Sequence, residues 1–126
     1  MKYIDTNILV RLITGDNPEL FVKALNLVES AGKGELYVDD SVLTELCFIL
    51  EFHQYQMKRE VIADAIIDLL NSGQMSFNDT TPETLNLYRS QTKLDFVDCL
   101  LVIKSSGDVM TFDKYLLKYI ASKKAR

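Results

Sequence analysis

The chain has 126 residues, of which 48% are hydrophobic and 25% are charged, which is the composition of one ordinary globular domain. A chain of this length buries about two-thirds of its unfolded surface when it folds, so it needs neither disulfides nor a structural metal to form a core. Fourteen Lys and Arg residues against 18 Asp and Glu residues give a formal net charge of -4. This balance argues against a generic nucleic-acid-binding protein, because such proteins are usually basic.

The sequence contains no apolar run of about 18 residues, and its first residues lead directly into a strand-like segment without an apolar leader. We therefore expect a cytoplasmic protein. Cys47 and Cys99 each stand in an apolar run, which predicts buried free thiols. His53 is the single histidine and lies in a polar stretch, so a His-rich zinc site and Ser-His catalysis are both disfavoured.

Short apolar segments alternate with helical patterns along the whole chain. Strands are predicted at residues 2–4, 36–38, 75–77 and 109–111. Helices are predicted at residues 7–13, 18–32, 42–52 with Ser41 as the cap, 58–73, 79–88, 95–104 and 114–122. Strands separated by helices predict a single α/β domain over residues 1–126, with a parallel sheet covered on both faces. In such sheets, the functional crevice lies beyond the carboxyl ends of the strands.

Two acids follow predicted strands and therefore stand where this crevice forms. Asp5 comes directly after residues 2–4, and Asp113 comes shortly after residues 109–111. Each is also a candidate cap for the helix that begins next to it, as is Thr6 at the first of these positions. Position alone therefore leaves both the capping role and the functional role open.

Two predicted helices carry acids beside their apolar positions. Glu45 either is crowded by apolar neighbours or lies on a solvated helix flank. Over residues 95–103, apolar residues are interrupted only by Asp95 and Asp98, so we predict that this helix is buried nearly all round. A buried carboxylate is costly unless it is paired, protonated or bound to a cation, which favours a functional role for Asp98. Asp95 is either the helix cap or a further member of the site.

If these acids meet at the carboxyl rim of the sheet, their negative charges must be neutralised. Two carboxylates about 6 Å apart repel each other by roughly 3 kcal/mol at an effective dielectric constant of about 20. Either protons or divalent cations must offset this repulsion. Ligands that are all oxygens, with no His or Cys nearby, favour Mg²⁺ or Mn²⁺. Such ions activate water and orient a phosphodiester for hydrolysis.

Four segments resemble, in order, the motifs of the PIN-domain ribonucleases. They are YIDTNIL at 3–9, LTEL at 43–46, DFVDCLL at 95–101 and MTFDK at 110–114. The chain is most similar to the small bacterial and archaeal members, the VapC-type toxins of toxin–antitoxin pairs, and the resemblance covers essentially all of it. The resemblance implies a three-layer α/β/α sandwich around a mostly parallel sheet of four to five strands. It also implies a metal-dependent endoribonuclease.

The same resemblance implies a quartet of catalytic acids, which by motif position are Asp5, Glu45, Asp98 and Asp113. Asp5 and Asp98 are the expected principal ligands of Mg²⁺ or Mn²⁺. Glu45 is expected to bind the ion directly or through water, and Asp113 to be an outer ligand. Bound cations would offset the charge of these four acids, so the acidic balance of the chain no longer excludes RNA.

Further polar residues match supporting positions of the family. Thr6 and Asn7 match polar positions beside the first acid, and Thr111 matches a hydroxyl that supports the site near the last. Two features depart from the family pattern. Cys99 replaces the small residue that usually follows the third-motif acid, and the connection at residues 104–108 is short.

The resemblance implies three partners, namely an RNA substrate, a small cognate antitoxin whose tail enters the active-site groove, and a second copy of the chain in a homodimer. Phe52 and Tyr55 are candidates for the dimer interface. Because RNA is a polyanion, we expect basic residues around the site, with Arg11 and Lys93 as candidates. Five of the fourteen basic residues lie in the last thirteen positions. Either their positive charges interact favourably with the dipole at the end of a solvated helix, or they contact RNA or a partner.

Other classes of protein match these residues less well. Haloacid-dehalogenase-like phosphatases require a second Asp two residues after the first, where this chain has Asn7. A receiver-like domain carries an acid pair after its first strand, whereas Asp39 and Asp40 follow the second predicted strand. An RNA-processing nuclease without an antitoxin and a catalytically inert PIN-fold binding module remain the alternatives to a toxin. The presence of all four acids favours an active enzyme.

Overall fold

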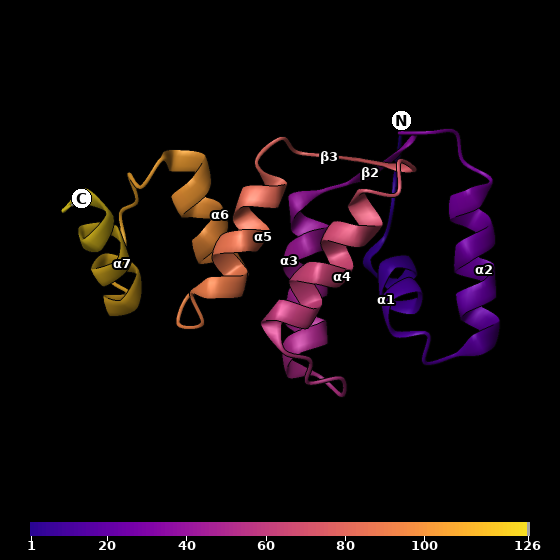
Figure 1. The fold of residues 1–126 in the computed structure, drawn as a ribbon, viewed down its shortest axis with the longest axis horizontal. Helices are drawn as coiled ribbons and strands as arrows, with labels where there is room; N and C mark the ends of the chain where they lie inside the picture. Colours follow the sequence, from indigo (N-terminus) through magenta and orange to yellow (C-terminus); the bar gives the residue numbers. More distant parts are fainter. Residues whose placement is uncertain (126) are drawn as a thin grey trace. The chain divides into compact units, whose positions relative to one another are not determined.

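The computed structural model describes residues 1–125, which form two compact units. The first unit spans Met1–Asp79 and contains a β-sheet with four helices, and the second begins at Thr80 and is helical. The ribbon of each unit is drawn in Figure 1. No helix within residues 1–125 is long and apolar enough to cross a membrane.

The sheet of the first unit has three parallel strands in the order β1-β2-β3. They are β1 (Lys2–Tyr3), β2 (Leu36–Val38) and β3 (Met75–Phe77), as predicted. Lys2 lies opposite Leu36, which in turn lies opposite Met75. Strand β2 is central and carries the buried side chains, whereas β1 is an edge strand with exposed residues.

The fourth predicted strand, at residues 109–111, is wrong. In the described part of the chain this segment forms no strand, and Met110 and Phe112 are fully exposed. A strand exists only where a neighbouring edge satisfies its backbone N–H and C=O groups, and local sequence does not specify such an edge. The sheet observed over residues 1–125 is therefore smaller than the four to five strands that the resemblance implied, although the α/β class with a parallel sheet is confirmed.

Local signals set the ends of the helices in the first unit. These helices are α1 (Thr6–Thr14), α2 (Pro18–Glu29), α3 (Asp40–Phe52) and α4 (Arg59–Leu70). Gly15 ends α1 in the left-handed conformation at φ 58°, which glycine adopts without strain. Asn17 accepts a hydrogen bond from the Leu20 N–H and so begins α2. The predicted cap Ser41 is wrong, because Asp39 accepts the Ser41 N–H at 3.1 Å and α3 begins two residues earlier.

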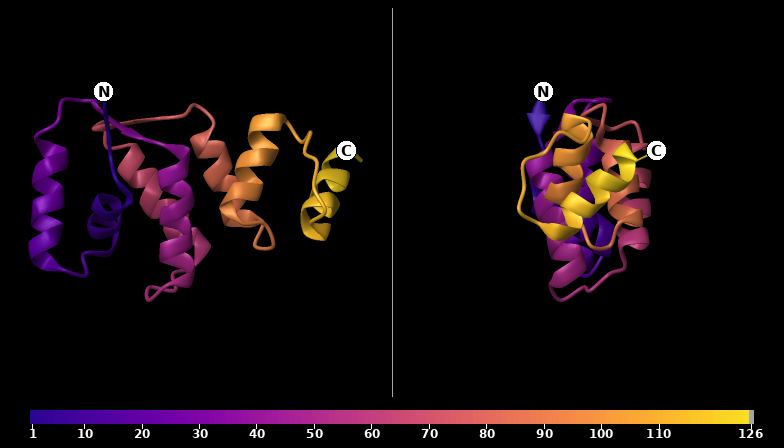
Figure 2. Two further views of the ribbon diagram at one scale, coloured as in Figure 1. Left: turned by 180° about the vertical axis from the view of Figure 1, so that it is seen from behind. Right: turned by 90° about the vertical axis from the view of Figure 1, so that its left-hand side faces the viewer.

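These helices build the core of the first unit together with the sheet. Helix α1 contacts both α2 and α3, and it lies between them in Figure 1 and in the left view of Figure 2. Helix α4 contacts α3 and β3. The core includes Leu43, Leu46 and Cys47 from α3 and Ile62 from α4, all essentially inaccessible to solvent. Cys47 is thus a buried thiol outside any disulfide, as predicted, and so is Cys99 in the second unit.

The second unit contains α5 (Thr81–Ser90), α6 (Phe96–Ser105) and α7 (Lys114–Lys124). Helix α5 packs against α6, and the Tyr88 ring meets the edge of Phe96 with 5.7 Å between ring centroids. The predicted burial of α6 on all sides is wrong. Its buried residues lie on one face, whereas Val97 and Leu101 are 43% and 47% exposed. Within this unit α5 packs against that face. An apolar sequence predicts burial on all sides only if a second element packs against the opposite face, and the sequence of a helix does not specify such a partner.

Candidate functional site

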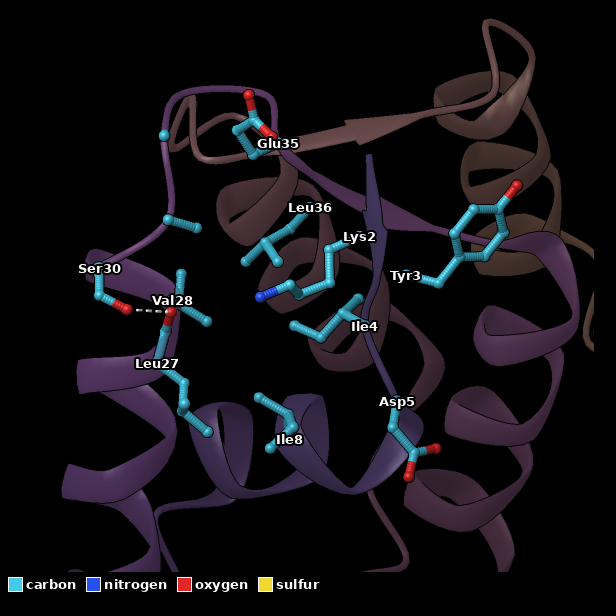
Figure 3. Close-up of a pocket in the computed structure, with 12 residues that line it drawn as sticks. Lys2, Tyr3, Ile4, Asp5, Ile8, Leu27, Val28, Ser30, Glu35 and Leu36 are labelled. Atoms are coloured by element: carbon cyan, nitrogen blue, oxygen red, sulfur yellow. Dashed lines mark hydrogen bonds between the residues drawn. The ribbon is translucent and has the colours of Figure 1, made fainter.

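Asp5 joins the edge strand β1 to helix α1. Its Oδ1 accepts the Thr6 N–H at 2.7 Å and caps the helix, while Thr6 itself is buried. Asp5 and the neighbouring Asn7 are exposed. Figure 3 places Asp5 at the end of β1, with its carboxyl group turned away from the side chains of Ile4 and Ile8. One carboxylate oxygen thus orients the helix start, and the other accepts no hydrogen bond from residues 1–125.

Glu45 lies on α3 between residues of the core. Leu43, Leu46 and Cys47 are buried, whereas Glu45 is exposed and accepts no hydrogen bond within the described chain. Glu45 therefore lies on a solvated helix flank, which is one of the two positions that the sequence left open. Both carboxylate oxygens of Glu45 are accessible to an ion.

Asp95 and Asp98 form a reciprocal capping box at the start of α6. The Asp95 Oδ1 accepts the Asp98 N–H at 2.7 Å, and the Asp98 Oδ2 accepts the Asp95 N–H at 3.2 Å. Asp95 is therefore the helix cap, one of the two roles the sequence allowed. Asp98 keeps one oxygen without a hydrogen bond within residues 1–125.

Asp113 caps α7 in a similar way. Its Oδ1 accepts the N–H groups of Tyr115 and Leu116, both at 2.9 Å. Its own N–H donates to the Thr111 hydroxyl at 3.0 Å, which ties Thr111 to the last acid as its motif position suggested. The second oxygen of Asp113 is exposed and accepts no hydrogen bond in the part of the chain described.

The surroundings of Asp98 favour its protonated form. Partial burial is the main cause that raises the pKa of Asp98, and the negative charges of Asp95 and Asp113 raise it further. The Asp95 N–H hydrogen bond opposes these effects. In the second unit, two carboxylates therefore repel the charge of Asp98, and a bound divalent cation would offset this repulsion.

The candidate acids divide equally between the units, with Asp5 and Glu45 in the first and Asp98 and Asp113 in the second. Among residues 1–125, no three His, Cys, Asp or Glu side chains are placed to hold a metal ion. Each of the four acids thus has a defined local position and at least one carboxylate oxygen that accepts no hydrogen bond from residues 1–125. Only the resemblance of the sequence motifs links the four acids to one another.

The PIN domain profile matches residues 2–121. The chain belongs to the PIN-domain family. PIN domains are generally nucleases that use divalent metal ions, so this chain has the fold of a hydrolase that acts on nucleic acid. Searches of curated proteins and of solved structures found no match.

The donor atoms of this PIN domain suit a hard divalent cation. All four quartet residues offer carboxylate oxygens, and each keeps at least one oxygen that accepts no hydrogen bond from residues 1–125. Mg²⁺ and Mn²⁺ prefer such ligands. In Asp5 and Asp113 the capping bond fixes the orientation of the carboxyl group, so the second oxygen is presented by a rigid helix terminus.

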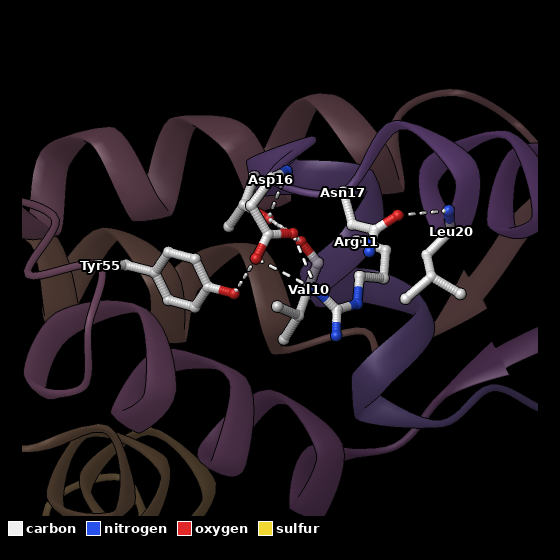
Figure 4. A network of polar contacts seen from close by, with 7 residues as sticks. Val10, Arg11, Asp16, Asn17, Leu20 and Tyr55 are labelled. Atoms are coloured by element: carbon white, nitrogen blue, oxygen red, sulfur yellow. Dashed lines mark hydrogen bonds and ion pairs between the residues drawn. The ribbon is translucent and has the colours of Figure 1, made fainter.

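Arg11, a predicted RNA contact, is engaged in the first unit of this PIN domain. Its Nη1 lies 2.9 and 3.1 Å from the two carboxylate oxygens of Asp16. The Tyr55 hydroxyl also donates to Asp16, at 2.7 Å, and Figure 4 shows the two donors on the same carboxyl group. The Tyr55 hydrogen bond, with help from Arg11 and Thr14, holds the pKa of Asp16 below its usual value. The charge of Arg11 is thus compensated by Asp16, close to the end of the same helix.

Sequence reasoning missed the link between Asp16 and Tyr55, which are 39 positions apart. No local pattern predicts a partner at such a distance. Of the two predicted interface residues, Phe52 is 57% exposed, whereas the Tyr55 hydroxyl is occupied by Asp16. Lys93, the other predicted RNA contact, is exposed, and its Nζ lies 5.4 Å from the centroid of the Tyr115 ring.

Proposed function

We propose that this PIN domain is a Mg²⁺- or Mn²⁺-dependent endoribonuclease. The observation that carries the proposal is the family match over residues 2–121, a range within which all four acids lie. In the proposed site, Asp5 and Asp98 are the principal ligands, Glu45 binds directly or through water, and Asp113 is an outer ligand. The bound ion supplies charge neutralisation and an activated water at the RNA phosphodiester.

The side chains of the chain itself have distinct tasks in this proposal. The capping bonds of Asp5 and Asp113 hold their carboxyl groups at fixed positions, which lowers the entropy lost when an ion binds. Asp98 must be ionised to bind, and its pKa is raised, so cation binding releases a proton when the pH is near that pKa. Asp95 and Thr111 hold Asp98 and Asp113 through backbone hydrogen bonds.

Cleavage of a mixed RNA substrate by Asp98→Asn tests the metal site. Asparagine can still accept the Asp95 N–H, so the capping box is kept while the charge is lost. We expect activity to fall by about 100-fold or more, because charge stabilisation at the reacting phosphate is lost. The matched control is Asp68→Asn, an exposed acid on α4, which should retain wild-type activity.

The same assay is run with Mg²⁺, with Mn²⁺ and with EDTA. EDTA should abolish cleavage, and either ion should restore it. Cleavage that persists in EDTA, or an Asp98→Asn protein as active as the control, would contradict the proposed mechanism. An inert PIN-fold binding module would show binding without cleavage in every arm.

We further propose that the protein acts in the cytoplasm as the toxin of a toxin–antitoxin pair, as a homodimer neutralised by a small cognate antitoxin. The support is the similarity of all four motifs to the VapC-type toxins. The competing assignment is an RNA-processing nuclease, which has no antitoxin. A small antitoxin frame immediately upstream of the gene favours the toxin.

Growth on expression tests the toxin assignment. The wild-type chain should arrest growth, and Asp5→Asn should relieve the arrest while leaving the fold intact, because asparagine still caps a helix. Circular dichroism of the purified variant provides the folding control. Arrest by Asp5→Asn as strong as that of the wild type would reject Asp5 as a ligand, and an active ribonuclease that never arrests growth would favour the processing role.

A further inference from the structure

A groove in the second unit combines three lysines with two tyrosines. It has a volume of about 420 Å³ and lies between the connection that follows α5 and one face of α7. Lys93 comes from that connection, and α7 supplies Tyr115, Lys118, Tyr119 and Lys123. We call it the lysine–tyrosine groove.

The spacing along α7 explains why these side chains share one face. Tyr115, Lys118, Tyr119 and Lys123 follow the three- and four-residue spacing that aligns side chains on one face of a helix. Leu116 and Ile120 occupy the neighbouring stripe and are buried, which fixes the orientation of α7. The groove is therefore a surface that the packing of α7 presents to solvent.

The groove is locally basic in an acidic chain. No acid is among its lining residues, and within residues 1–125 none of its three lysines lies in ion-pairing distance of a carboxylate. The chain as a whole carries a net charge of -4. The charge of this groove is thus opposite to that of the chain and complementary to a polyanion.

The tyrosines hold the ammonium groups close to aromatic faces. Lys93 and Lys114 lie 5.4 and 5.2 Å from the centroid of the Tyr115 ring, and Lys123 lies 5.4 Å from that of Tyr119. Tyr115 nevertheless remains 41% exposed. Exposed aromatic rings beside flexible cations are the combination that binds unpaired nucleotides, in which the bases stack and the phosphates meet the cations.

We propose that the lysine–tyrosine groove binds a single-stranded segment of the RNA substrate and leads it to the acids of the second unit. The proposal rests on the ribonuclease function above. Tyr115 is bonded through its backbone to Asp113, and Lys93 lies two residues before Asp95, so both walls of the groove continue into the candidate acids. A duplex does not fit this chemistry, because its bases are already stacked on one another.

Fluorescence anisotropy of a labelled ten-nucleotide single-stranded RNA tests the proposal. The full chain is used in EDTA, so that binding is measured without cleavage and does not depend on the metal mechanism. The triple variant Lys93→Gln, Lys118→Gln, Lys123→Gln should bind at least about 10-fold more weakly. Its dependence of log affinity on log salt should be shallower by about 0.7 for each lysine removed.

A matched triple variant controls for net charge. Lys23→Gln, Lys33→Gln, Lys58→Gln removes three lysines from the first unit and should keep the affinity within about twofold of the wild type. An equal loss in both triples would overturn the groove as the binding site. The nuclease proposal would survive that result if the RNA is still cleaved, so the two proposals fail separately.

The tyrosine contribution has its own test. Tyr115→Leu should weaken RNA binding severalfold with an unchanged salt dependence, and Tyr115→Phe should bind like the wild type because it keeps the ring. A ten-residue poly-glutamate peptide and an RNA duplex serve as competitors and should bind weakly. Equal binding of Tyr115→Leu and the wild type overturns the proposal, as does a peptide that binds as tightly as RNA, which would identify an acidic protein segment as the ligand.

Discussion

The two units of this chain present their candidate acids in different ways. In the first, Asp5 and Glu45 stand in solvent on elements that are anchored by a sheet and a buried helix core. In the second, the charges of Asp95 and Asp113 act on Asp98, and the helix that carries Asp98 leaves apolar residues exposed. The first unit is therefore a scaffold that holds its acids in solvent. In the second unit, a bound cation would relieve the repulsion that raises the pKa of Asp98.

Core truncation should give the largest difference between the units. Leu46→Ala removes a fully buried side chain of α3 and should lower the free energy of unfolding by about 2–5 kcal/mol. Leu101→Ala on α6, which is 47% exposed, should change it by less than about 0.5 kcal/mol. Urea unfolding measures both. Equal losses of stability in the two variants would contradict the difference between the units, because Leu101 would then have to be buried.

Loss of a capping acid should have a smaller effect that separates stability from activity. Asp113→Ala removes the acceptor for two N–H groups of α7 and should cost about 1 kcal/mol. Asp113→Asn keeps a capping oxygen and should restore stability, but it should not restore RNA cleavage, since the ligand charge is absent. Thermal unfolding and the cleavage assay check the two effects. Full activity of Asp113→Asn would remove Asp113 from the metal site.

Asp98 should give the smallest effect on stability, with an opposite sign. Because the pKa of Asp98 is raised in the folded chain, its ionised form opposes folding above that pKa. Asp98→Asn should therefore stabilise the metal-free protein at neutral pH, by less than about 1 kcal/mol since the group is partly solvated. The gain should decrease as the pH falls through the raised pKa, and it should vanish below the ordinary value of 3.8, where Asp98 is protonated in both the folded and the unfolded chain.

Unfolding of both proteins across a pH series in EDTA makes this measurement, with Asp68→Asn as the control. A variant less stable than the wild type at neutral pH would contradict the sign. An equal gain in Asp68→Asn would assign the effect to overall charge rather than to the surroundings of Asp98.

Much of the local structure could be predicted from the sequence, because its causes are local. The three short apolar segments became strands, and Gly15 and Pro18 mark the end and the start of helices as their backbone preferences predict. Asp5, Asp95 and Asp113 were recognised as candidate caps, and all three cap helices. A capping role does not exclude a role in the site, since it occupies only one carboxylate oxygen.

The features that could not be predicted depend on partners far along the chain. A fourth strand at residues 109–111 needed an edge to pair with, and burial of α6 on all sides needed more than one neighbouring helix. The hydrogen bond between Tyr55 and Asp16, the carboxylate that also pairs with Arg11, is of the same kind. The convergence of the four acids also depends on distant partners and remains a proposal that the cleavage assay tests.

The edge strand β1 has a consequence for the behaviour of the protein at high concentration. Open strand edges recruit other chains and promote aggregation, and proteins counter this with short strands and lysines. Strand β1 has only two residues, one of which is Lys2. Figure 3 shows the Lys2 amino group projecting beside that edge, into a hollow of about 470 Å³ lined largely by apolar side chains. An incoming strand would have to desolvate this charge, so Lys2 disfavours pairing of a second chain at this edge.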